Sequence, residues 1–136
     1  MRRSIAAVLA VFNALNGLVM LIAGPFWWAN VPGVTETGPF NPHFVQDVGA
    51  AYLVAGLALG ARAWRQRYWP AAVAGAGFLV AHALIHLLMI MAGHDHHAAA
   101  NLALVVLPAA LALYFSVPKP RRPPCVAGSR AACFAR

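Results

Sequence analysis

Four long apolar runs, separated by short polar segments, dominate the sequence. They cover residues 4–23, 44–63, 70–92 and 98–117. A helix that crosses a bilayer needs about 20 mostly apolar residues, because lipid offers no hydrogen-bond partner to an unpaired backbone group. The pattern predicts an all-α fold, an integral membrane four-helix bundle over residues 1–117. The basic, proline-rich tail at 118–136 is predicted to lack packed structure.

Composition supports a membrane protein and argues against a soluble one. Of the 136 residues, 62% are hydrophobic and 10% are charged, which is too apolar for an ordinary soluble domain. A net charge of +7 would suggest nucleic acid as the partner of a soluble protein. Here the basic residues lie in short segments between the apolar runs, so we expect the lipid bilayer, and not nucleic acid, as the partner.

The distribution of basic residues predicts the orientation of the four spans. Lysine and arginine are retained on the cytoplasmic side of a membrane, and all ten fall on one side of a four-span order. Both termini are therefore predicted to be cytoplasmic, with residues 24–43 and 93–97 outside. The first run could also belong to a signal peptide, but it is long and lacks a small-x-small cleavage site, which favours a retained span. The basic residues are Arg2, Arg3, Arg62, Arg65, Arg67, Lys119, Arg121, Arg122, Arg130 and Arg136.

Small residues in the spans predict close helix packing. Gly56 and Gly60 form a GxxxG pattern with Gly49 nearly in line, which favours contact within the bundle or between two copies of the chain. Asn41 and Pro42 are typical of a helix entrance, as cap and first turn. The turn-rich segment 24–43 is expected to fold back over the mouth of the bundle.

Polar side chains gather in one zone of the predicted bundle. Counting about 1.5 Å per residue from the middle of each run places them from the midplane to roughly 11 Å outward. Ionisable residues inside a membrane are costly and normally face partners or a cavity. We therefore predict a polar pocket in the outer half, in which Asp47 meets His86. Its members are Asn13, Asn16, His43, Asp47, Tyr52, His82, His86 and Asn101.

Three kinds of role remain open for these side chains. They can form a hydrogen-bond network that only fixes helix packing. They can bind copper or zinc, with His94, His96 and His97 outside, joined by Asp95 and His43, and His82, His86 and Met89 within. They can also serve redox or proton chemistry, where a quinone needs a titrating imidazole near a carboxylate and a haem needs His43 or a second copy as its further ligand.

The chain resembles the small four-span bacterial membrane proteins grouped as DoxX-like, many of them domains of unknown function. The resemblance lies in Gly24-Pro25 at the end of the first run, the proline-rich segment after it, and the start of the second run, Gln46-Asp47-Val48-Gly49-Ala50-Ala51-Tyr52 before Gly56. It implies a compact four-helix bundle and, with the alanine- and arginine-rich composition, a bacterial inner membrane. Some members are associated with quinone-linked redox systems, but the resemblance assigns no catalytic residue.

The role expected from the sequence is an accessory or small-molecule-handling membrane protein with a polar pocket that opens outward. Metal binding or transport, and a quinone- or haem-linked redox role, are the alternatives. A homo-oligomer through Gly56 and Gly60, or a membrane partner protein, is also expected. Cys125 and Cys133 are predicted to lie in a reducing compartment, where no structural disulfide forms.

Overall fold

The computed structural model describes residues 2–118, and this part of the chain contains helices and loops but no strand. The predicted all-α fold with four helices long and apolar enough to cross a membrane is confirmed. Beyond Pro118, the predicted tail lies outside the described residues, as do Cys125 and Cys133. The long helices are α1 (Arg2–Ile22), α3 (Pro42–Trp64), α4 (Trp69–Met91), and a last one built from α5 (Ala98–Asn101), the π-helical turn η3 (Leu102–Val106) and α6 (Leu107–Ser116).

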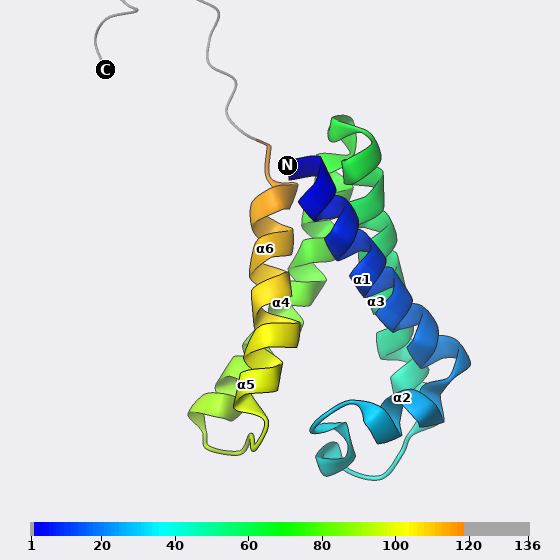
Figure 1. Ribbon diagram of the computed structural model, residues 1–136, viewed down its shortest axis with the longest axis vertical. Helices are drawn as coiled ribbons and strands as arrows, with labels where there is room; N and C mark the ends of the chain where they lie inside the picture. The colour runs from blue at the N-terminus through cyan, green and yellow to red at the C-terminus, as the bar shows by residue number, and fades with distance from the viewer. Residues whose placement is uncertain (1, 119–136) are drawn as a thin grey trace, which may run out of the picture.

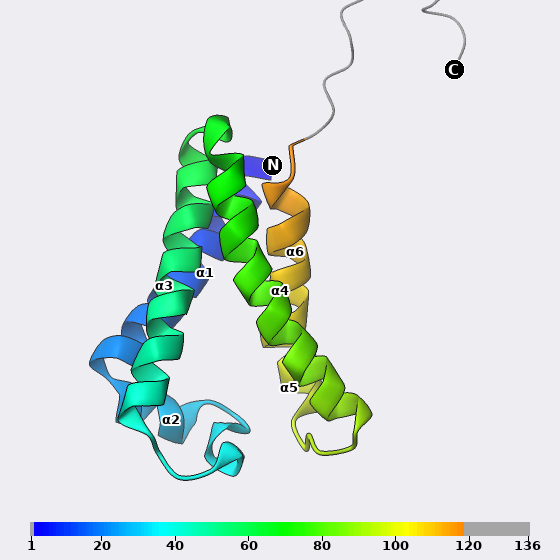
Figure 2. The ribbon, with the colours of Figure 1, turned by 180° about the vertical axis from the view of Figure 1, so that it is seen from behind.

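The long helices form two pairs, which we call arms (Figure 1). One arm is α1 with α3, and the other is α4 with the α5–η3–α6 helix. The arms meet at the end that carries the start of α1, the 3-10 turn η2 (Gln66–Tyr68) and the end of α6, here called the terminal end. They diverge toward the opposite end, which carries residues 23–41 and 92–97 and is here called the loop end (Figure 2).

The seam between α1 and α3 is built on glycine. A Cβ atom added to Gly17 would lie 2.5 Å from the carbonyl oxygen of Gly49, and one added to Gly56 would lie 2.5 Å from the backbone nitrogen of Ala14. Backbones approach this closely only where side chains are absent. Gly60 faces α1 more loosely, with Ala10 at 3.7 Å from an added Cβ. The surface at Gly56 and Gly60 that the sequence offered for a second copy is therefore occupied by α1 of the same chain.

In the terminal half the two arms are joined by small side chains and one buried cation. A Cβ on Gly75 of α4 would lie 3.1 Å from Cα of Ala55 on α3. Arg62, 8% exposed, donates from Nε to the carbonyl oxygen of Ser116 at 3.3 Å. The Ser116 hydroxyl lies 2.7 Å from the carbonyl oxygen of Ala112 in its own helix and 3.3 Å from that of Ala72 on α4. The positive guanidinium also interacts favourably with the partial negative charge at the carbonyl end of α6. This contact therefore holds α3 against α6.

The segment between α1 and α3 is more ordered than a turn-rich loop. Residues Gly24–Asn30 form the short helix α2, with Pro25 in its first turn, and Val34–Thr37 form the 3-10 turn η1. Trp27 of α2 donates from Nε1 to Oδ1 of Asn16 on α1 at 3.0 Å. The sequence prediction missed α2, because its helical conformation depends on this tertiary anchor as well as on the proline start.

The last long helix is irregular near its middle. The π-helical turn η3 lies just before Pro108, which stands in the first turn of α6. Proline has no backbone N–H to donate, so a carbonyl one turn earlier loses its usual helical partner. A π-helical turn is one way in which a helix accommodates such a break.

Candidate functional site

Two imidazoles lie one turn apart on α4 at the centre of the candidate site. The Nε2 atoms of His82 and His86 are 3.2 Å apart, and the ring centroids are 4.8 Å apart. Both side chains are half-buried. One ring must donate and the other must accept in this contact, so the two imidazoles cannot both be protonated at Nε2. The predicted sharing of a helix face by this pair is found in the structure.

An aromatic side chain from the other arm packs against the pair. Tyr52 of α3 meets the His82 ring edge to face, with centroids 5.6 Å apart and planes at 82°. Phe78, one turn before His82, stacks on the His82 ring at 6.1 Å and meets Tyr52 edge to face at 5.4 Å. Tyr52 is 9% exposed, and within residues 2–118 its hydroxyl has no hydrogen-bond partner. The four rings form one cluster between α3 and α4.

The expected contact between Asp47 and His86 is wrong. Asp47 Oδ2 instead lies 2.8 Å from Nδ1 of His43, and their side chains are 68% and 84% exposed. The physical reason is the helical rotation of α3. Five residues separate Asp47 from Tyr52, which turns their side chains about 140° apart around the helix axis. With Tyr52 facing α4, Asp47 and His43 lie on the exposed face of α3, away from the ring cluster.

Asp95 is held by two hydrogen bonds just beyond the end of α4. Asp95 accepts a hydrogen bond from the Asn101 side chain at 2.8 Å and one from the backbone N–H of His97 at 2.7 Å. The Asn101 hydrogen bond lowers the pKa of Asp95 from its ordinary value; desolvation opposes this, while the His97 N–H and the nearby imidazoles of His86 and His97 lower it further. The carboxylate is therefore held ionised near the loop end of α4.

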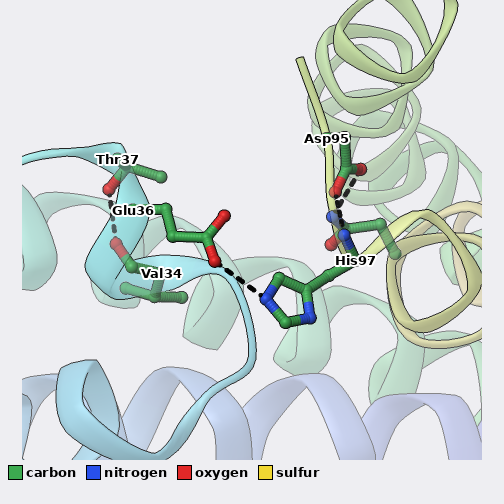
Figure 3. Close-up of polar contacts among 6 residues, drawn as sticks. Val34, Glu36, Thr37, Asp95 and His97 are labelled. Atoms are coloured by element: carbon green, nitrogen blue, oxygen red, sulfur yellow. Dashed lines mark hydrogen bonds and ion pairs between the residues drawn. The ribbon is translucent and has the colours of Figure 1, made fainter. Parts of the chain in front are cut away.

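His97 also links the two arms at the loop end. Its Nε2 atom lies 3.0 Å from Oε1 of Glu36 on η1, as Figure 3 shows. Gly33, at φ +81°, lies beside the same ring, and a Cβ there would be 3.2 Å from Cδ2 of His97. Glu36 was not among the predicted site residues. It is the sole acidic residue of segment 24–43 and lies 61 positions before His97 in the chain. Its negative charge was the signal in the sequence that could have suggested a histidine as its partner.

The remaining predicted residues take separate positions. Asn13 is 1% exposed and donates to the Leu9 carbonyl of its own helix at 2.7 Å, while Asn16 holds Trp27. His94 and His96 are exposed. Within residues 2–118, no group of three or more His, Cys, Asp or Glu side chains is arranged to hold a metal ion. The predicted polar layer is thus divided between the ring cluster, the loop-end contacts and helix anchors.

Fold and site together define a class of protein, a helical chain with four potential membrane spans and an imidazole pair between its two arms. Comparisons of the chain with protein-family models, with curated proteins and with solved structures found no match. The role of the protein is therefore argued from the geometry of the ring cluster and its surroundings.

Proposed function

We propose that this protein is a multi-pass protein of the bacterial inner membrane that binds a small molecule at the ring cluster of Tyr52, Phe78, His82 and His86. The four long apolar helices support insertion in a bilayer. The ten basic residues on one side of the span order support cytoplasmic termini, so the loop end faces outward. The resemblance to DoxX-like proteins supports the compartment.

The observation that carries the proposal is the unused hydrogen-bonding capacity of the cluster. His82 and His86 satisfy each other through Nε2, which leaves the Nδ1 atom of each ring. Within residues 2–118, neither Nδ1 atom nor the buried Tyr52 hydroxyl has a hydrogen-bond partner. Buried polar groups of proteins are nearly always paired, and lipid cannot pair them. A bound molecule with donor and acceptor groups would satisfy these atoms.

The surrounding rings favour a flat, partly apolar ligand. The faces and edges of Phe78 and Tyr52 offer stacking, while the imidazoles and the phenol offer hydrogen bonds. A quinone ring has this chemistry and remains the redox alternative. A haem fits less well, because His43, its predicted further ligand, is 84% exposed on the opposite face of α3 and pairs with Asp47.

The test is native mass spectrometry of the full chain in nanodiscs. We expect the wild-type protein to retain a non-lipid small molecule that His82→Leu/His86→Leu loses. The matched control, His94→Leu/His96→Leu, removes the same number of imidazoles from exposed positions and should retain the ligand. Equal retention by all three proteins, or its absence from the wild type after incubation with a membrane extract, would contradict the proposal.

A metal ion is the second candidate ligand, and one distance favours it. In a tetrahedral zinc site with Zn–N bonds of about 2.0–2.1 Å, neighbouring ligand nitrogens lie about 3.3 Å apart. The Nε2 atoms of His82 and His86 are 3.2 Å apart, so one ion could replace the shared proton. The pair supplies two ligands, and the others would be water or a bound molecule.

Elemental analysis after incubation with zinc or copper tests this candidate. We expect one ion per chain in the wild type and in His94→Leu/His96→Leu, and none in His82→Leu/His86→Leu. Loss of the ion in the exposed variant alone would move the metal to the loop-end histidines. Absence of a stoichiometric ion in every protein would sink the metal role and leave the organic ligand.

A further inference from the structure

The arms are fastened very differently at their two ends. In the terminal half they meet through Gly75 against Ala55 and through the buried Arg62. Among the hydrogen bonds and ion pairs of residues 2–118, the pair of Glu36 and His97 is the one that joins the arms at the loop end. Along α4, Phe78, His82 and His86 of the ring cluster lie between Gly75 and the loop end.

His97 is held in place for its contact with Glu36 (Figure 3). Its backbone N–H donates to Asp95 at 2.7 Å, and Asp95 is itself fixed by Asn101 at 2.8 Å. Gly33 leaves space for the imidazole, because a side chain there would crowd Cδ2 of His97. The ring therefore meets the carboxylate from a preset position, although the two residues belong to segments far apart in the chain.

The contact is also easy to break. The side chains of His97 and Glu36 are 38% and 50% exposed, so water competes for both and screens their attraction. Within residues 2–118, no glycine brings the backbones of the two arms together at the loop end as Gly17 and Gly56 do in the α1–α3 seam. A specific but weak contact between two diverging arms has the properties of a closure that opens and re-forms.

We propose that the Glu36–His97 pair is a latch, which holds the loop ends of the two arms together and whose release opens the bundle toward the ring cluster. Motion would be concentrated at the loop end, since the terminal half is fastened by backbone contact and a buried cation. The latch is inferred from the geometry of the loop end. It rests on the proposed function only in that the opening would admit the small molecule to the ring cluster.

The experiment measures the distance between the loop ends of the full chain in nanodiscs. Spin labels are placed by Thr35→Cys and His94→Cys, both at exposed positions, in a Cys125→Ser/Cys133→Ser background. Double electron–electron resonance should give a short, narrow distance distribution. Glu36→Ala and His97→Ala should each lengthen and broaden it. His97→Gln, whose amide N–H occupies nearly the place of the imidazole Nε2, should restore most of the short distance.

Asp47→Ala is the matched control. It removes a carboxylate that pairs with a histidine near the same end of the molecule, but within α3 alone, so the distribution should not change. Glu36→Gln, of unchanged size, replaces Glu36→Ala if the smaller side chain does not yield folded protein. A wild-type distribution in both the Glu36 and the His97 variants, or an equal change in Asp47→Ala, would overturn the latch.

The experiments distinguish a failure of the latch proposal from a failure of the proposed binding site. An unchanged distance in Glu36→Ala, with ligand still lost from His82→Leu/His86→Leu, rejects the latch and keeps the site. A lengthened distance with no ligand in any protein keeps the latch and rejects the site.

Discussion

The α1–α3 seam and the junction of the arms at the loop end show two ways of holding helices together. At the seam, glycines bring backbones so close that an added Cβ on Gly56 would lie 2.5 Å from Ala14 N. At the loop end, a half-exposed imidazole touches a carboxylate across 3.0 Å. The polar atoms at the first contact are backbone groups within helices, while both partners of the second are side chains that can turn to solvent.

The difference indicates where the molecule is rigid. In lipid, helices associate through close packing and interhelical hydrogen bonds, so a seam without side chains tolerates little change in spacing. An exposed pair contributes little energy and can be lost without disturbing either arm. The ring cluster lies between the firm junction of the two arms in the terminal half and their weak junction at the loop end. This position suits a site that must admit a ligand. Substitutions in the seam should therefore lower the stability strongly, whereas substitutions at the loop end should change the distance between the arms with little loss of stability.

The largest effect is expected at the seam. Gly56→Ala places a methyl group against the backbone of Ala14, and we expect a loss of stability of about 2 kcal/mol or more, because neither helix can move aside cheaply. Gly77→Ala is the control, since nothing lies within 4 Å of its added Cβ, and it should be neutral or stabilising by up to about 1 kcal/mol. Reversible unfolding in mixed detergent micelles measures both. Equal stability of the two variants would contradict the close backbone contact between α1 and α3 at Gly56.

A smaller effect is expected at the terminal-end junction. Arg62→Met removes a charged donor from the Ser116 carbonyl in a buried position, and we expect a loss of about 2 kcal/mol. Arg65→Met provides the control, because Arg65 is exposed and its cation lies over the Trp64 ring at 4.6 Å, a contact contributing about 0.5–1 kcal/mol. The same unfolding measurement applies. A loss for Arg62→Met no greater than that for Arg65→Met would show that the arms are held elsewhere.

Much of the fold could be predicted from the sequence, since an apolar run of about 20 residues is typical of one long helix. The four apolar runs coincide with the long helices, and the predicted cap is confirmed, as Asn41 accepts from the backbone N–H of Phe44 at 3.1 Å. The helix α2 was missed because its seven residues are too few to show the hydrophobic periodicity of a helix, and because Asn16, which anchors it, belongs to α1.

The site was predicted in part. Spacing of four places His82 and His86 on one helix face, so local geometry was enough. The predicted pairing of Asp47 with His86 was wrong because the position of a residue along a helix axis does not determine where its side chain points around that axis. The contact of Glu36 with His97 depends on the tilt of whole arms, which residue spacing does not encode. Local patterns thus located the imidazole pair of His82 and His86, while the contact of Glu36 with His97 depended on tertiary arrangement.

The smallest effect on stability is expected at the latch, although its effect on the distance between the arms should be large. Exposed ion pairs contribute about 0.2–1 kcal/mol, so a double-mutant cycle of Glu36→Ala and His97→Ala should give a coupling energy of about 0.5 kcal/mol. A cycle of His43→Ala and Asp47→Ala, a more exposed pair within one helix, is the control and should couple no more strongly. A coupling above about 2 kcal/mol for Glu36 and His97 would mean that the loop end is fastened like the seam. The two regions would then no longer differ, and a latch that opens under ordinary thermal motion would be contradicted.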